Sequence, residues 1–131
     1  MSPLYKSTRK FVLFDAVVSH GQLLLRADKI DGSACNVDVI FFDTMYVQLP
    51  TYLNSISIHQ NADGKRFGYK TIDEGLDKKY QTLFEIRSGT ESYYVAASWF
   101  RVFENSLSFG ETSLGVLTYK GREKEIARSS S

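Results

Sequence analysis

The side chains that could perform acid–base or metal chemistry are few in this sequence of 131 residues. It contains two histidines, His20 and His59, and one cysteine, Cys35. Because metal sites need clustered His, Cys or carboxylate ligands, and these three residues stand at no recognised spacing, we predict no metal site and no cofactor. The ordinary pKa of an imidazole suits acid–base work. An enzyme built from this sequence would therefore use His59, with Glu85 or Tyr69 as helpers.

Two short motifs resemble ligand-binding loops but lack the residues that bind. Residues 61–64 (Asn-Ala-Asp-Gly) resemble the middle of a calcium loop, yet the alignment puts Lys70 where a bidentate glutamate is needed. Gly110 and Gly115 have the spacing of a phosphate loop, without its lysine. There is also no G-x-S-x-G motif. Partners of a nucleophile meet in space rather than in sequence, so a serine or cysteine activated by His59 stays open.

Aromatic residues are interleaved with an arginine near residue 100. Trp99 and Arg101 alternate along one predicted strand face, where the guanidinium could stack on the indole. Such faces on small β-folds can bind single-stranded nucleic acid, but sixteen basic residues oppose fifteen acidic ones. We therefore expect no nucleic-acid ligand. The candidate binding residues are Trp99, Arg101, Tyr93, Tyr80 and His59.

Composition indicates one ordinary globular domain. Apolar residues make up 43% of the chain and charged residues 24%, which excludes a disordered or fibrous protein. A single cysteine suits a reducing compartment, and Asp15 interrupts the only apolar run that resembles a signal peptide. No apolar stretch approaches the roughly 18 residues that span a bilayer. We expect a cytoplasmic protein with no membrane contact.

Residues 11–30 carry the clearest hairpin pattern, with His20-Gly21 between two alternating segments. This dipeptide predicts a two-residue type I′ turn with positive φ at both positions. The register would then place Asp15 opposite Arg26 on the less buried face, as an opposite-charge pair. On the other face, the register would oppose apolar residues: Val18 to Leu23, Ala16 to Leu25 and Phe14 to Ala27.

A second hairpin is predicted over residues 80–103, with Gly89-Thr90 as a type II′ turn. Tyrosine, tryptophan and phenylalanine are abundant in its second half, which favours one long strand over 91–103. The register would pair four residues on the core face: Ile86 with Tyr93, Phe84 with Val95, Thr82 with Ala97, and Tyr80 with Trp99.

Weaker patterns predict the remaining elements. We expect further strands at 36–42, 53–60, 66–72 and 114–119, and a short helix over 72–79. Asp63-Gly64 would join the second and third of these strands in a hairpin. That hairpin would place Ile58 opposite Tyr69, and His59 opposite Gly68.

Together these elements define an all-β class. We predict seven or eight short antiparallel strands in a meander-like small barrel or sandwich, with at most one or two short helices. Residues 1–131 would form a single domain, with 1–9 and 121–131 as peripheral or poorly ordered ends. Large apolar residues also fall on the nominally outward strand faces. A terminal helix, the edge of the other sheet or a second copy of the chain could cover them.

Three functions are compatible with this profile. The leading hypothesis is a non-catalytic β-domain that binds a protein partner or self-associates, in an accessory, inhibitor or immunity-type role. The alternative is a barrel that encloses a small apolar or aromatic ligand, lined by residues such as Tyr80, Phe84, Tyr93 and Trp99. The third is an enzyme with His59 as its acid or base.

Overall fold

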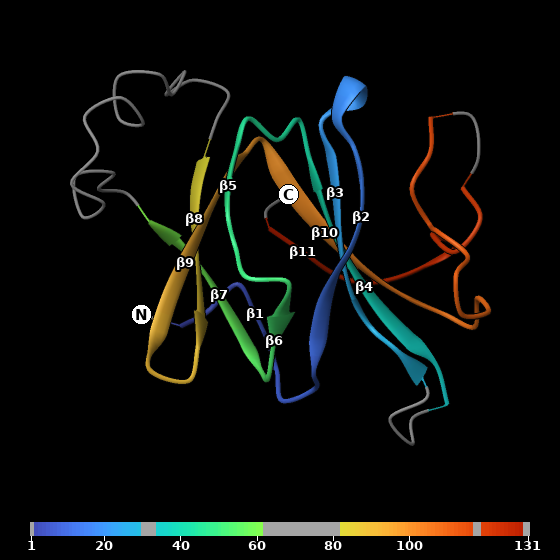
Figure 1. The fold of residues 1–131 in the computed structure, drawn as a ribbon, viewed down its shortest axis with the longest axis horizontal. Coiled ribbons are helices and arrows are strands. Elements are labelled where there is room, and N and C mark those ends of the chain that lie inside the picture. The colour runs from blue at the N-terminus through green and yellow to red at the C-terminus, as the bar shows by residue number, and fades with distance from the viewer. Residues whose placement is uncertain (1, 30–33, 62–81, 117–118, 130–131) are drawn as a thin grey trace.

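The chain folds into two antiparallel β-sheets that face each other, as the computed structural model of residues 2–29, 34–61, 82–116 and 119–129 shows (Figure 1). Sheet A contains, in spatial order, β1 (Tyr5–Ser7), β7 (Ile56–Asn61), β8 (Thr82–Ser88), β9 (Glu91–Ala97) and β5 (Tyr46–Gln48). Sheet B contains β11 (Lys124–Arg128), β10 (Trp99–Asn105), β4 (Asn36–Phe42), β3 (Gln22–Ala27), β2 (Phe11–Val17) and β6 (Tyr52–Leu53).

The all-β class is confirmed, and of the two forms predicted the chain adopts the sandwich. The sheets do not close into a barrel, so the barrel form of the ligand hypothesis is wrong. The segments expected at the periphery supply edge strands, since β1 and β11 each border one sheet. Among the described residues, no helix has the length and apolar character needed to cross a membrane.

Aromatic packing fills the centre of the sandwich. Phe84 of sheet A meets Phe100 of sheet B with ring centroids 5.3 Å apart and nearly perpendicular planes. Phe41 completes the cluster at 5.6–5.7 Å from both rings. Each of these side chains is at most 2% exposed. Edge-to-face and tilted contacts of this kind stabilise aromatic pairs in addition to the effect of burial. Phe84, which was expected to line a ligand cavity, therefore fills the core.

The chain passes between the sheets twice at one corner of the sandwich. The connection from β4 to β5 lies beside the connection from β9 to β10. The predicted strand 91–103 is in fact β9 and β10, which belong to different sheets and separate at Ser98. The Ser98 backbone N–H donates to Phe42 O at 3.0 Å, and its hydroxyl donates to Asp43 Oδ2 at 2.6 Å. Trp99 therefore pairs with Phe42 of sheet B. Its predicted partner, Tyr80, lies outside the described residues.

The first hairpin exists, but its turn and register differ from the prediction. A short 3-10 turn, η1 (Val18–His20), precedes Gly21, and only Gly21 has positive φ, at 64°. The longer turn and a β-bulge between Leu13 and Asp15 shift the register, so Asp15 lies opposite Leu24. The predicted Asp15–Arg26 pair is therefore wrong.

The second hairpin is confirmed in register from Thr82 opposite Ala97 to Ser88 opposite Glu91. Gly89 has φ of 62°, as the first position of a type II′ turn requires. The strand at 36–42 is also confirmed, as β4.

Two other strand predictions are wrong. The segment 53–60 is divided between β6 and β7, and Ile58 pairs with Tyr5 on one side and Ile86 on the other, which excludes its predicted pairing with Tyr69. The described residues of 114–119 form no strand, and the last strand is β11. The predicted strand at 66–72 and helix at 72–79 lie outside the described residues.

A segment that we call the strap, residues 106–116, covers part of the outer face of sheet B (Figure 1). Leu114 of the strap packs with Leu24, Ile40 and Phe103 in a second, smaller apolar cluster. Outward-facing apolar residues of sheet B are thus covered by the chain itself. This cover was not among the three that the sequence suggested.

Candidate functional site

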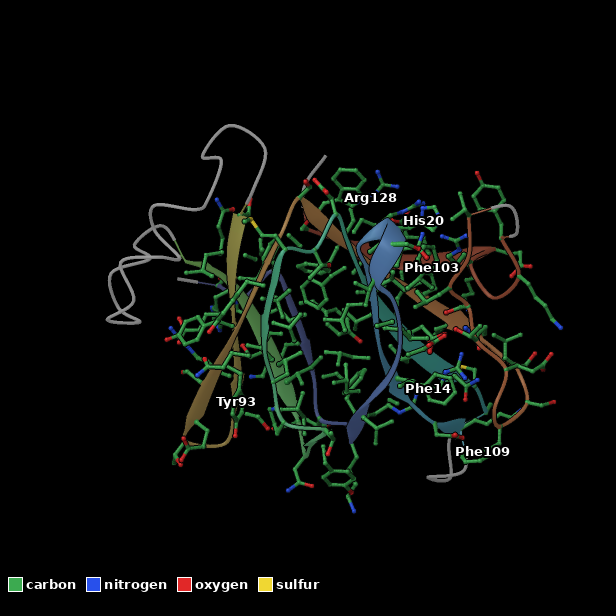
Figure 2. All side chains as sticks on the ribbon, turned by 45° about the horizontal axis from the view of Figure 1, so that its top comes forward. Phe14, His20, Tyr93, Phe103, Phe109 and Arg128 are labelled. Carbon is green, nitrogen blue, oxygen red and sulfur yellow. The ribbon has the colours of Figure 1, made fainter. Side chains whose placement is uncertain are left out.

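The predicted binding residues do not form one site. Trp99 and Arg101 lie two residues apart on the outer face of sheet B, whereas His59 is on the outer face of sheet A. Tyr93 packs against the main core at the sheet A side, far from Phe103 and Arg128 of sheet B (Figure 2). Tyr80 lies outside the described residues. The candidate residues are therefore divided between the two sheets, and three separate surfaces carry polar or aromatic groups that could bind or react.

The first surface is a polar row on the outer face of sheet A. Strand β7 directs Ile56 and Ile58 into the core, and alternation turns Ser57 and His59 outward on the same face. Their side chains are in contact, with Ser57 Oγ 2.6 Å from His59 Nε2. A serine hydroxyl hydrogen-bonded to an imidazole is the arrangement that general-base activation of a nucleophile requires.

A carboxylate lies opposite this histidine on the next strand. Glu85 of β8 is the cross-strand partner of His59, and it is 6% exposed. Its Oε2 accepts hydrogen bonds from Arg87 Nε at 3.0 Å and Ser92 Oγ at 2.8 Å. Burial opposes ionisation, but these two bonds and the Arg87 charge outweigh it and hold the pKa of Glu85 below its usual value.

The surroundings of the His59 imidazole favour its neutral form. Burial lowers the pKa of His59, and the nearby Arg87 charge lowers it further, while Glu85 acts in the opposite direction. A neutral imidazole can accept the Ser57 proton, provided that the other ring nitrogen carries the hydrogen. The row thus pairs a histidine suited to act as a base with an ionised carboxylate.

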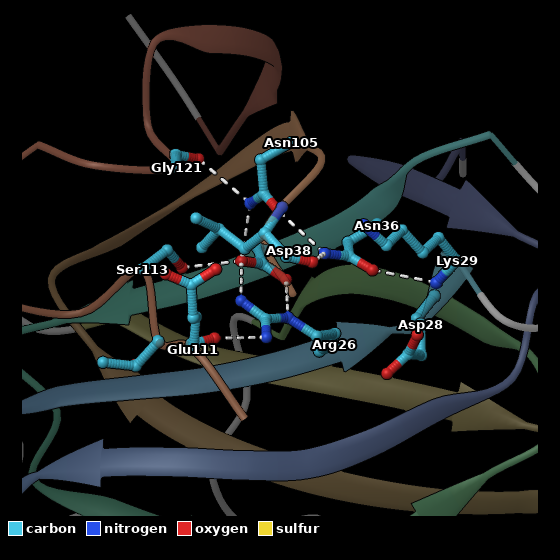
Figure 3. Close-up of polar contacts among 12 residues, drawn as sticks. Arg26, Asp28, Lys29, Asn36, Asp38, Asn105, Glu111, Ser113 and Gly121 are labelled. Carbon is cyan, nitrogen blue, oxygen red and sulfur yellow. Dashed lines mark hydrogen bonds and ion pairs between the residues drawn. The ribbon is translucent and has the colours of Figure 1, made fainter. Parts of the chain in front are cut away.

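The second surface is covered by the strap and contains a buried ion pair (Figure 3). Arg26 Nε and Nη2 donate to Asp38 Oδ1 and Oδ2 at 2.7 and 2.8 Å, with both side chains at most 1% exposed. Ser113 Oγ and Asn105 Nδ2 also donate to Oδ2, at 2.6 and 2.8 Å. Arg26 Nη1 donates to Glu111 O of the strap at 2.5 Å.

This buried network binds the strap to sheet B, and the side chains of its ion pair are closed to solvent. The Phe14 ring covers the Arg26 guanidinium, 4.2 Å from its centroid. Charges taken out of water must be fully paired to be tolerated, and Arg26 and Asp38 pair with each other and with groups of the strap. We assign the network a structural role.

The third surface is aromatic and cationic, at the other end of the outer face of sheet B. Trp99 is 46% exposed and stacks on Phe42, with centroids 5.8 Å apart and planes 23° from parallel. Arg101 lies over the Phe103 ring at 5.0 Å and donates to Glu125 at 2.8 Å. The predicted stacking of Arg101 on Trp99 is therefore replaced by stacking on Phe103.

A small apolar hollow lies beside the turn of the first hairpin. It has a volume of about 200 Å³ and is lined mainly by Ala16, Val18, Leu23, Met45 and Val47. None of the aromatic residues expected to surround a ligand lines it. Among the described residues, no group of three or more His, Cys, Asp and Glu is placed to hold a metal ion.

Comparison with known proteins gives no relative from which a function could be transferred, because no family model, no curated protein and no solved structure matches the chain. The functional assignment therefore rests on the two surfaces that remain exposed, the polar row of sheet A and the aromatic and cationic surface of sheet B. Sequence reasoning selected His59, Glu85, Trp99 and Arg101, but it attached no role to Ser57. The signal for Ser57 was its two-residue spacing from His59 in a predicted strand, which places both on one face.

Proposed function

We propose that this chain is a protein-binding β-sandwich domain whose partner contacts the outer face of sheet B around Trp99. The observation that carries the proposal is the half-exposed Trp99 ring, fixed in place by its stacking on Phe42. Tryptophan, tyrosine and arginine dominate the binding energy of protein interfaces. A ring that is already held in one position loses little conformational entropy when a partner covers it.

Arginine and tyrosine residues extend this face. Tyr119 is 71% exposed and lies 5.0 Å from the Arg122 guanidinium. Arg101 is near enough to Arg122 to lower its pKa, in addition to the larger effect of burial. We call Trp99, Phe42, Arg101, Tyr119 and Arg122 the aromatic–arginine face.

Charge on and beside this face indicates the chemistry of the partner. Glu125 is shared between Arg101 and Arg128, so one carboxylate neutralises only one of these two guanidinium charges. Arg122 adds a further positive charge near Arg101. Charge complementarity therefore favours a protein that presents apolar and acidic side chains to the aromatic–arginine face.

A photo-cross-linking residue at position 119 in living cells tests the proposal. It should capture a discrete protein, whereas the same residue at position 109 should not, although Phe109 is 79% exposed. Phe109 lies away from Phe103 and Arg128 and is thus a matched control (Figure 2). Mass spectrometry identifies the captured protein, and light scattering at micromolar concentration shows whether it is a second copy of the chain.

Affinity measurements with the captured protein then test the role of Trp99. Trp99→Ala should weaken binding at least about 30-fold, as expected for a central interface residue. Phe109→Ala should change the affinity by less than about twofold. A monomer from which position 119 captures nothing, or equal effects of the two variants, would overturn the proposal.

A further inference from the structure

A second group of reactive side chains lies on the outer face of sheet A, away from the aromatic–arginine face. The Ser57 hydroxyl and the His59 imidazole touch, and Glu85 lies directly across from His59 on β8. Ser57 is partly exposed, whereas Glu85 is buried. A reachable hydroxyl, a base in contact with it and a buried carboxylate beside the base are the parts of a nucleophilic site.

The carboxylate has a defined task in such a site. When the imidazole accepts a proton, it becomes positive, and the ionised Glu85 beside it stabilises that charge. Arg87 and Ser92 hold the carboxylate in place through their hydrogen bonds to it. Because no hydrogen bond from the His59 ring to Glu85 is part of this arrangement, the carboxylate acts on the imidazole through its charge.

Two cationic side chains flank the serine. Lys6 of β1 and Arg87 of β8 are the cross-strand partners of Ser57 on its two sides, and both extend from the same face of the sheet. The Arg87 side chain is 49% exposed and uses Nε and Nη2 for Glu85. Positive charge on both sides of a nucleophile attracts an anionic substrate and stabilises negative charge that develops on the attacked group.

We infer that Ser57 is the nucleophile of an esterase site that hydrolyses carboxylic esters whose acyl part carries a negative charge. Ser57 Oγ bonds to the ester carbonyl carbon while its proton passes to His59 Nε2. The carbonyl oxygen becomes an oxyanion between Lys6 and Arg87. The carbon–oxygen bond to the alcohol then breaks, and His59 returns the proton to the departing alkoxide.

Water completes the reaction. His59 removes a proton from a water molecule, whose oxygen attacks the acyl group on Ser57. The acyl–Ser57 bond breaks, the proton returns to Ser57 Oγ, and the carboxylic acid product leaves as its carboxylate. One ester and one water thus give one acid and one alcohol, and no further reactant is needed.

The test uses the full chain and mono-4-nitrophenyl succinate, whose hydrolysis releases a coloured phenolate. The wild-type protein should release a burst of one equivalent, and peptide mass spectrometry should place the succinyl group on Ser57. Ser57→Ala and His59→Gln should each lower the rate at least about 100-fold. His20→Gln is a matched control, because His20 is the only other histidine and is exposed. It should retain the wild-type rate within about twofold.

Substrate preference tests the flanking cations independently. The wild-type protein should prefer the succinate ester to neutral 4-nitrophenyl acetate. Lys6→Gln should reduce that preference several-fold, and it should also slow the burst, because Lys6 stabilises the oxyanion. Circular dichroism checks that each variant is folded. The inference is overturned if the burst persists in His59→Gln, if the acyl group is found on another residue, or if the wild-type rate equals that of His59→Gln. None of these outcomes depends on whether a protein binds sheet B.

Discussion

Each sheet of the sandwich carries arginine–carboxylate pairs on its outer face, and the Arg26–Asp38 pair of sheet B differs in burial from the Arg87–Glu85 pair of sheet A. The side chains of Arg26 and Asp38 of sheet B are 1% and 0% exposed, whereas the side chains of Arg87 and Glu85 of sheet A are 49% and 8% exposed. Both arginines donate Nε and Nη2 to their carboxylate. The same pairing chemistry is therefore buried in the Arg26–Asp38 pair and lies at the protein surface in the Arg87–Glu85 pair.

The strap accounts for this difference. On sheet B it supplies Glu111 O and Ser113 Oγ, which satisfy groups that water would otherwise solvate. Once covered, the pair is costly to break, but it is out of reach of any ligand. On sheet A, Arg87 remains half in solvent, where it stabilises the fold little but can meet a substrate.

The largest expected effect follows from removing one buried partner. Asp38→Ala leaves the Arg26 charge buried and unpaired, and it also removes the acceptor for Ser113 and Asn105. We expect the free energy of unfolding to fall by about 3–5 kcal/mol. Urea denaturation followed by circular dichroism measures this change.

A double variant tests whether the destabilisation in Asp38→Ala comes from the unpaired charge that it leaves on Arg26. Replacing both partners with apolar residues, in Arg26→Met with Asp38→Leu, removes the buried charges together. We expect it to be clearly more stable than Asp38→Ala alone. If Asp38→Ala costs no more than the loss of Arg87 on sheet A, the contrast between the two faces is wrong.

The buried pair also shows where sequence reasoning stopped. The alternation of apolar residues in β3 and β4 was predictable. However, Arg26 was predicted to pair across the strands with Asp15, because His20-Gly21 resembles a two-residue turn. The real turn contains η1, and a β-bulge shifts β2 further. Register depends on such turn geometry. By contrast, Gly89-Thr90 is a true two-residue turn, and every cross-strand pair that it predicted among the described residues within sheet A is present.

The candidate sites were predictable only in part for a related reason. His59 and Glu85 were selected as single residues, but their pairing depends on β8 being the neighbour of β7, and the sequence suggested a hairpin partner instead. Trp99 and Arg101 were selected for their composition. That they lie on sheet B follows from the change of sheet at Ser98, which no local pattern indicates.

The turns of the two hairpins extend the comparison to backbone geometry. Gly21 has φ of +64°, and a Cβ atom there would lie 2.9 Å from Thr44 N. Gly89 has φ of +62°, but a Cβ atom at that position would meet no atom within 4 Å beyond its chain neighbours. A β-carbon in a left-handed conformation costs about 1–2 kcal/mol by itself.

Gly21→Val should therefore destabilise the protein by more than this conformational cost, because the backbone of residues 43 and 44 must also move. Gly89→Ala should show only the conformational cost. Thermal unfolding of the two variants measures both. Equal losses at the two turns would mean that the close contact at Gly21 relaxes without penalty.

A smaller effect is expected for the exposed pair of sheet A. Arg87→Ala removes two hydrogen bonds to Glu85, but Ser92 Oγ still donates to the carboxylate. Half of the Arg87 side chain is in solvent, so we expect a loss of less than about 1 kcal/mol in urea denaturation. A loss as large as that of Asp38→Ala would show that exposure does not distinguish the two pairs.

The smallest expected effect is a change in the titration of His59. Burial first, and the Arg87 charge second, place the pKa of His59 below its ordinary value of 6.5. Since the unfolded chain then binds a proton more readily than the folded protein, His59 makes stability fall as the pH drops through about 6.5. Arg87→Gln removes the second cause and should raise the pKa of His59 while leaving the effect of burial. NMR titration of the imidazole protons in both proteins measures this change. A pKa of His59 that stays the same in Arg87→Gln would mean that the cation does not act on the imidazole, and the row on sheet A would lose the electrostatic coupling on which its chemistry depends.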